Sequence, residues 1–328
     1  MDGLLKWGIE LILYLQGLGN WLTFPMQIFT FMGSGEFYLL LMPALYWCIS
    51  AEIGLELGIL LMFSYTVNFV FKMGFHQPRP SWLDPAVHPK TVETSFGIPS
   101  GHAQNAVTVW GFLDLKTRKL WRWVVAVLLT ILIGFSRLVL GVHFPTDVLA
   151  GWLIGLLVLW SFARLIPAIR NWITKLRPWP QVGLALAVSI LMILAGALTR
   201  VSLGSWEIPQ EWIDNAQKAD PGSAPITPLD LSNIVSNGGV LFGLASGAVL
   251  ISRRGGYQAK GKPLQLILRY LIGVVGVFAL WRGLDLAFPS GAGPLPLMLQ
   301  YVRYGLVGFW ITGLAPLVFR RIGLSPTT

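Results

Sequence analysis

The stretch LWRWVVAVLLTILIGFSRLVLGVHFPTDVLAGWLIGLLVLW, residues 120–160, joins two apolar runs through a short polar segment. Each run has roughly 20 residues, which is enough for an α-helix to cross a lipid bilayer. The polar segment and its flanks carry Arg137, His143 and Asp147. Ionisable residues so close to membrane helices are rare without a purpose, so the stretch predicts two spanning helices with a functional site where they meet.

The composition of the whole chain is that of a membrane protein. Hydrophobic residues make up 54% of the sequence and charged residues 12%, and the mean hydropathy is +0.64. Charged residues make up about 25% of an ordinary soluble domain, so the composition excludes that class. We predict an all-α fold, a polytopic integral membrane helical bundle of about nine transmembrane helices, within a range of about eight to ten. The expected spans are residues 36–50, 53–72, 101–116, 121–141, 146–166, 181–199, 236–252, 265–284 and 298–319.

The expected spans divide the chain into three parts. Residues 1–35 mix polar with apolar side chains, so we expect helices that lie at the membrane interface rather than a further span. Residues 36–170 form the expected core helices, which carry all the polar motifs described below. Residues 171–328 supply additional transmembrane helices and an outer loop at 201–235, for which a lid and a solvated loop are both open. The segment GGVLFGLASGAVL in this part has the small residues of tight helix–helix contacts.

The net charge of +9 is concentrated in four basic clusters. The expected helices place all four clusters on one side of the membrane, which the positive-inside rule assigns to the cytoplasm together with the C-terminus. No cluster is combined with a nucleic-acid-binding motif, so we expect no nucleic-acid partner. The clusters are Lys116, Arg118, Lys119 and Arg122; Arg164, Arg170, Lys175 and Arg177; Arg253, Arg254, Lys260 and Lys262; and Arg320 and Arg321.

Three short polar motifs emerge on the opposite side, which is the periplasm or cell exterior of a bacterium or an organelle lumen. They are KMGFHQPRP (72–80), PSGH (99–102) and SRLVLGVHFPTD (136–147). One miscounted helix would have separated them. Because all three fall on the same side, we predict that they form a single site at the extracytoplasmic interface.

The first two motifs carry groups that bind anions. Lys72 is a compact positive charge, and the guanidinium of Arg79 can hold two phosphate oxygens at once. Cations that snorkel at a helix end would give the same pattern. Ser100 is a favourable N-cap, and Gly101 allows an anion to approach the free N–H groups of a helix start. His102, at the same start, can give or take a proton near neutral pH.

The third motif contains a histidine and a carboxylate in a useful arrangement. His143 and Asp147 are four residues apart, so the carboxylate can accept a hydrogen bond from one ring nitrogen. The other nitrogen then carries a free lone pair, as a histidine nucleophile requires. The same pair could form half of a metal site, but the nearby cations would repel a metal ion. We therefore expect no metal and no cofactor.

Together the motifs resemble those of the type 2 phosphatidic acid phosphatase superfamily. Its pattern is Lys-x6-Arg-Pro, then Pro-Ser-Gly-His, then Ser-Arg-x5-His-x3-Asp, and every position is filled here in order, within about residues 36–166. The stretches FVFKMGFHQPRPSW, ETSFGIPSGHA and HFPTDVLAG are similar to those of membrane glucose-6-phosphatases. They are also similar to those of many bacterial lipid-phosphate phosphatases.

This resemblance implies a metal-independent phosphatase, a hydrolase of phosphoric monoesters or diphosphates. His143 would attack phosphorus and form a phosphohistidine, Asp147 would stabilise the imidazolium, and His102 would protonate the leaving oxygen. The phosphate-binding residues would be Lys72, Arg79, Ser100, Gly101 and Arg137.

The expected substrate is a lipid phosphomonoester or diphosphate, of the phosphatidate or polyprenyl diphosphate type. A site near the interface is within reach of a lipid headgroup whose tail stays in the bilayer. A sugar phosphate is the alternative that the glucose-6-phosphatase-like layout raises. From another class, a lipid transporter with a headgroup site and a phosphotransferase both stay open. The presence of His102, His143 and Asp147 argues against the transporter, since headgroup binding requires only the cations.

Overall fold

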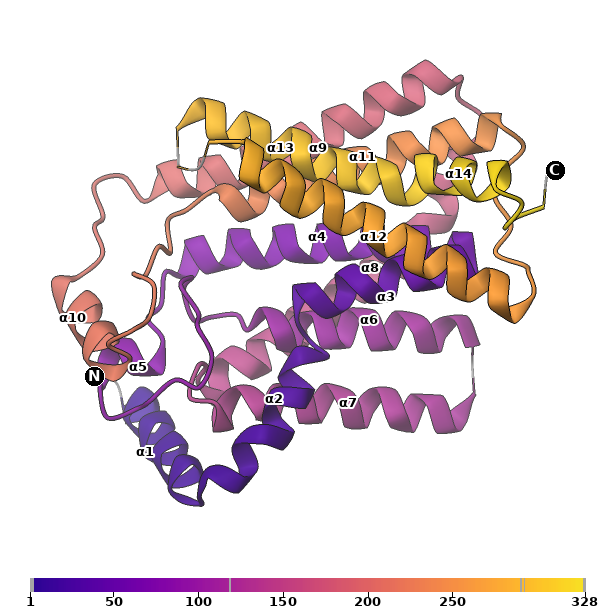
Figure 1. The fold of residues 1–328 in the computed structure, drawn as a ribbon. Helices are drawn as coiled ribbons and strands as arrows, with labels where there is room; N and C mark the ends of the chain where they lie inside the picture. Colours follow the sequence, from indigo (N-terminus) through magenta and orange to yellow (C-terminus); the bar gives the residue numbers. More distant parts are fainter. Residues whose placement is uncertain (1–2, 118, 290, 292, 327–328) are drawn as a thin grey trace. The chain divides into compact units, whose positions relative to one another are not determined.

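The computed structural model describes residues 3–117, 119–289, 291 and 293–326, and across these ranges the chain is helical with no β-strand (Figure 1). This confirms the predicted all-α class. Arg118, from the first basic cluster, lies outside the described residues. The helices are α1 (Gly3–Gly17), α2 (Thr23–Phe31), α3 (Gly35–Cys48), α4 (Ala51–Phe75), α5 (Pro80–Leu83), α6 (Gly101–Thr117), α7 (Leu120–Val139), α8 (Pro145–Ile173), α9 (Pro178–Ser202), α10 (Gln210–Ala219), α11 (Ser232–Arg253), α12 (Pro263–Ala287), α13 (Pro294–Phe309) and α14 (Ala315–Arg321).

Seven helical segments of the described chain are long and apolar enough to cross a bilayer. A bent pair, Asn20–Phe31 with Gly35–Cys48, raises the number to eight if it forms one span. The chain is therefore an integral membrane protein, whereas the expected number of nine spans is not confirmed. The difference arises because α3 has 14 residues and α6 has 17, each short of the roughly 20 residues that cross a bilayer alone.

The chain divides into two compact units, and each draws on separated segments of the sequence. The first unit comprises Met1–Phe37, Val67–Ser161 and Gly196–Asp230. The second comprises Tyr38–Thr66, Phe162–Ala195 and Leu231–Thr328. The division expected from the sequence cuts the chain into three consecutive parts, whereas these two units are defined by contacts between residues. The three-part division therefore stays a prediction.

Glycines on α8 bring the first unit's helices together. A Cβ atom at Gly151 would lie 2.6 Å from the carbonyl oxygen of Ser100, and one at Gly155 would lie 2.6 Å from that of Gln104. Two glycines four residues apart form one flat helix face, so the backbones of α8 and α6 approach closely. The start of α6 is thereby held against the first turn of α8, which also contains Asp147.

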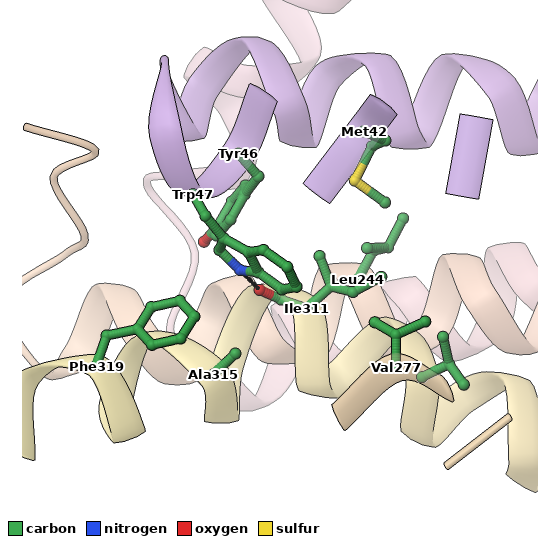
Figure 2. Close-up of a cluster of buried hydrophobic side chains, with 9 residues drawn as sticks. Met42, Tyr46, Trp47, Leu244, Val277, Ile311, Ala315 and Phe319 are labelled. Carbon is green, nitrogen blue, oxygen red and sulfur yellow. Dashed lines mark hydrogen bonds between the residues drawn. The ribbon is translucent and has the colours of Figure 1, made fainter. Parts of the chain in front are cut away.

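In the second unit, α11 packs closely against α13. A Cβ atom at Gly239 would meet the carbonyl oxygen of Tyr301, and one at Gly243 would meet that of Gly305. This is the tight helix contact that the small residues of the GGVLFGLASGAVL segment indicate. A separate apolar cluster in this unit surrounds Trp47, whose indole N–H donates to the carbonyl oxygen of Ile311 at 2.8 Å (Figure 2).

Candidate functional site

All eight predicted site residues lie in the first unit, where turns and helix ends bring them together. Lys72 is in the last turn of α4, and Arg79 is the residue before α5. Gly101 begins α6, Arg137 is in the last turn of α7, and Asp147 is in the first turn of α8. Side chains at a helix end are not covered by a further helical turn, so the ends of five different helices can surround one point.

The histidine and the carboxylate of the third motif form the expected pair. His143 Nδ1 lies 3.0 Å from Asp147 Oδ2, and the same oxygen accepts the backbone N–H of Phe144 at 3.0 Å. Both side chains are buried. A carboxylate that faces Nδ1 favours the proton on that nitrogen, which leaves Nε2 as a lone pair.

The surroundings of His143 favour its neutral form. Burial, followed by the positive charges of Arg79, Lys72 and Arg137, lowers the pKa of His143 well below its usual value. Arg79 Nη1 lies 3.2 Å from His143 Nε2, so a guanidinium N–H faces the lone pair. The imidazole is therefore unprotonated and ready to act as a nucleophile near neutral pH.

Two of the cations, Lys72 and Arg79, are held by oxygen atoms of nearby loops. Lys72 Nζ donates to the carbonyl oxygen of Phe96 at 2.5 Å and to Ser95 Oγ at 2.9 Å. Arg79 Nε donates to the carbonyl oxygen of Ser95 at 2.6 Å, and its Nη1 donates to that of Val142 at 2.8 Å. Buried charges need such partners, and these fix both cations in place.

Arg137, the third cation, is 1% exposed and is held from two directions. Its Nη1 donates to the hydroxyl of Thr30 on α2, and its Nη2 donates to Glu93. Its Nε has no hydrogen-bond partner among the described residues, although it is buried. A buried donor without a partner is costly, and an anion oxygen at this place would satisfy it.

The start of α6 supplies backbone donors beside the cations. Ser100 Oγ accepts the N–H of Ala103 at 3.4 Å, and the N–H of Ser100 donates to the main-chain oxygen of Asp147 at 2.9 Å. A Cβ atom at Gly101 would lie 3.2 Å from the side-chain oxygen of Asn68, so a glycine fits this crowded position. The N–H groups of a helix start attract anions, and the phosphate-binding role expected of Ser100 and Gly101 stays a prediction.

One carboxylate of the site, Glu93, belongs to none of the three motifs. Its Oε2 lies 3.1 Å from Arg79 Nη2, its Oε1 accepts from Arg137, and Oε1 lies 4.0 Å from Nδ1 of His102. Burial alone would raise the pKa of Glu93, but the charges of Arg79 and Arg137 outweigh burial and hold that pKa well below its usual value. In the sequence, the hint of this role is that Glu93 shortly precedes the PSGH motif. No sequence pattern indicates the contact of Thr30 with Arg137.

The two remaining histidines contact the segment 201–230. His76 stacks edge-on against Trp206, with ring centroids 5.2 Å apart. A nitrogen of His88 lies 3.1 Å from the main-chain oxygen of Ala219 in α10. Within the described ranges, no group of three His, Cys, Asp or Glu side chains is arranged to hold a metal ion.

The outer segment 201–230 covers one side of the site. Asn215 of α10 donates to the main-chain oxygen of Trp82 at 3.1 Å, and the N–H of Thr227 donates to that of Thr94 at 3.1 Å. A pocket between this segment and the site is lined by both polar and apolar residues and reaches two of the charged groups. Its lining includes Arg79, Glu93, Ser81, Thr91, Asp220 and Ser223.

Two family models match this chain. The model of the PAP2 superfamily matches residues 53–172, which contain every predicted catalytic and phosphate-binding residue. A second model, the transmembrane extension of PAP2 superfamily phosphatases, matches residues 235–327. Residues 53–172, which carry the cationic histidine site, thus belong to the PAP2 superfamily, and residues 235–327 match the transmembrane extension of its phosphatases.

Several curated proteins are similar to parts of the chain. Undecaprenyl-diphosphatase of Sulfolobus acidocaldarius is 34% identical over 105 residues, 32% of this chain and 50% of that protein. Phosphatidylglycerophosphatase B of Bacillus subtilis is 38% identical over 101 residues, 28% of this chain and 47% of that protein. Glucose-6-phosphatase 3 of Bos taurus is 27% identical over 256 residues, 70% of this chain and 72% of that protein. The chain thus spans about half the length of the first two of these relatives.

Proposed function

We propose that this protein is a metal-independent membrane phosphatase that hydrolyses a lipid phosphomonoester or diphosphate through a phosphohistidine at His143. The observation that carries the proposal is the arrangement around His143 Nε2. A neutral, carboxylate-paired imidazole lies among three buried cations and beside the start of a helix. This combination attracts a phosphoryl group and offers it a nucleophile.

In the first half-reaction, His143 Nε2 forms a bond to phosphorus while the bond from phosphorus to the leaving oxygen breaks. Lys72, Arg79 and Arg137, with Ser100 and the N–H of Gly101, bind the phosphoryl oxygens. Their charges stabilise the transition state, in which negative charge spreads over those oxygens. His102 gives its proton to the leaving oxygen.

In the second half-reaction, water replaces the imidazole. His102, now neutral, takes a proton from the water as its oxygen bonds to phosphorus and the phosphorus–nitrogen bond breaks. Asp147 stabilises the positive charge that His143 carries while it is phosphorylated. His143 is then neutral again and free phosphate is released.

The proposed topology has nine spans, with α3 and α6 as shorter ones. The site would lie on the extracytoplasmic face and the C-terminus in the cytoplasm. The basic clusters at 116–122 and 164–177 support this orientation, because they fall at the ends of α6, α7 and α8 opposite to those that carry the motifs. The core helices of 36–170 would then carry the chemistry, and those of 171–328 would extend the bundle.

A sugar phosphate is the second candidate substrate. The match to glucose-6-phosphatase 3 extends over 70% of this chain, far more than the matches to the two lipid-phosphate phosphatases. The pocket beside Arg79 and Glu93 also has hydroxyl and carboxylate groups in its wall, from residues such as Ser223 and Asp220. Groups of this kind hydrogen-bond to the hydroxyls of a sugar.

The test is phosphate release by the purified protein in detergent with EDTA present. The panel contains phosphatidate, a polyprenyl diphosphate and glucose 6-phosphate, and His143→Ala is the matched inactive variant. Release from a lipid that is lost in the variant supports the leading proposal, and release only from glucose 6-phosphate supports the second. An alkaline quench should retain labelled phosphate on the wild-type protein. Activity that survives in folded His143→Ala would refute the assigned nucleophile.

A further inference from the structure

The carboxylate of Glu93 contacts cations on two sides and faces a histidine on a third. One of its oxygens accepts a hydrogen bond from Arg137 Nη2 and lies 4.0 Å from Nδ1 of His102, and the other faces Arg79. The Glu93 side chain is 21% exposed, whereas those of Arg79 and Arg137 are 2% and 1% exposed. Glu93 therefore lies at the open edge of the cationic cluster, next to His102, which is 22% exposed.

The loop that carries Glu93 is held on both sides of this residue. Before it, the N–H of Lys90 donates to the main-chain oxygen of Leu140 at 2.9 Å. After it, the main-chain oxygen of Thr94 accepts the N–H of Thr227 at 3.1 Å. The fold thus places the carboxylate beside His102.

The charges around His102 make such a partner necessary. Arg79 and Arg137 both contact Glu93, so their positive charges lie close to His102 and disfavour its protonated form, yet a general acid must carry a proton when the substrate binds. Asp147 is already engaged by His143 and by the N–H of Phe144. Within the described part of the cluster, Glu93 is the carboxylate that faces the His102 ring.

We propose that Glu93 is a positioning residue that orients His102 as the general acid, by accepting the Nδ1–H of its ring and leaving Nε2 towards the leaving oxygen. This inference rests on the proposed function. The site then has two histidine–carboxylate pairs with separate tasks. Asp147 orients the nucleophile His143, and Glu93 orients the proton donor.

The proton movements balance without a proton on Glu93. The proton on His102 Nε2 moves to the leaving oxygen as that oxygen separates from phosphorus and His143 Nε2 bonds to it. In the second step, His102 Nε2 takes a proton from the attacking water. Glu93 holds the Nδ1–H during both steps and stays ionised throughout.

The experiment compares two leaving groups in Glu93→Gln. The p-nitrophenolate of p-nitrophenyl phosphate departs without a proton, whereas the alkoxide of glucose 6-phosphate or the lipid oxygen of phosphatidate needs one. We expect kcat to fall about 10²-fold on the alkyl esters and less than about 5-fold on the aryl ester. KM should change little on either. Glu207→Gln, an exposed carboxylate of the outer segment, is the matched control.

A double-mutant cycle adds a second readout. If Glu93 acts through His102, then Glu93→Gln should cost almost nothing further in a His102→Ala background. Should Glu93→Gln fail to fold, Glu93→Asp withdraws the same charge by one methylene group and is compared in the same way.

Equal losses on aryl and alkyl esters, a loss confined to KM, or additive effects in the cycle would overturn the inference. Each would mean that Glu93 only holds the two arginines. Wild-type protein that hydrolyses none of the esters would instead overturn the proposed function. The two failures are thus separate.

Discussion

Arg79 Nη1 lies 3.2 Å from Nε2 of His143, and the same nitrogen donates to the main-chain oxygen of Val142 at 2.8 Å. The guanidinium therefore faces the atom proposed to attack phosphorus. A phosphoryl group that approaches Nε2 displaces this contact, and its oxygens can then accept the guanidinium N–H groups. The planar fork of arginine matches two phosphoryl oxygens, which a lysine ammonium does not.

We expect Arg79→Lys to lower kcat/KM by about 10²- to 10³-fold, because one positioned donor to the transition state is lost. Steady-state phosphate release measures this effect. Arg282→Lys, at an exposed site, is the control and should change nothing. A variant that keeps more than half of the wild-type kcat/KM would contradict the role of the fork.

Asp147→Asn keeps the size of the side chain but removes its charge. An asparagine can no longer stabilise a phosphorylated, positively charged His143, and it can turn the wrong ring nitrogen towards phosphorus. We expect kcat to fall on the order of 10³- to 10⁴-fold, by analogy with other carboxylate-oriented histidines. Rapid-quench measurement should show a much slower formation of phosphohistidine. Unchanged formation would mean that the pair is structural.

The depressed pKa of His143 predicts a particular pH dependence. In the unfolded chain this histidine becomes protonated below a pH of about 6.5, whereas in the folded chain it stays neutral there. The unfolded state therefore binds more protons. The contribution of His143 to the free energy of unfolding is complete above about pH 6.5. It is lost as the pH falls from there towards the folded-state pKa of His143. In ¹⁵N-histidine NMR, the resonance that is missing from His143→Ala should keep its neutral-imidazole shift when the pH falls below the ordinary histidine pKa of about 6.5. A titration midpoint near the ordinary value would refute this.

Gly155→Ala tests the close approach of α8 and α6. The new methyl group would lie 2.6 Å from the main-chain oxygen of Gln104 and 2.9 Å from the Cβ of Val107. The helices must separate, so we expect a loss of about 1–3 kcal/mol in stability and a loss of activity. Gly183→Ala on α9 meets nothing within 4 Å and should be neutral or slightly stabilising. Thermal unfolding of both variants in detergent makes the comparison, and equal midpoints would contradict it.

Thr30→Val removes the hydroxyl that accepts from Arg137 while it keeps the side-chain shape. A buried guanidinium N–H would lose its partner, which costs about 1–3 kcal/mol. We expect kcat/KM to fall about 10-fold, since Arg137 would be less well held. Thr30→Ser keeps the hydroxyl and should retain most of the activity. If Val and Ser at this position behave alike, then the hydroxyl does not position Arg137.

The sequence predicted those features that depend on local spacing. His143 and Asp147 are four residues apart on one chain segment, so their hydrogen bond follows from helix geometry. The helical class follows from long apolar runs. Contacts between distant segments had no comparable signal, because a loop carboxylate such as Glu93 or a helix hydroxyl such as Thr30 looks like any other. The number of spans was also beyond sequence patterning, because the expected spans 36–50 and 101–116 are both shorter than a usual crossing and their helices α3 and α6 have only 14 and 17 residues.

Lys72 and Arg79 are held by the main-chain oxygens of residues 95, 96 and 142. Every amino acid carries such an oxygen, whatever its side chain. These bonds therefore make no demand on the side chains of Phe96 and Val142, which instead pack into the buried surroundings of the site. The two cations are fixed by the path of the main chain, so the phosphate-binding centre depends on the fold rather than on the chemistry of these neighbours.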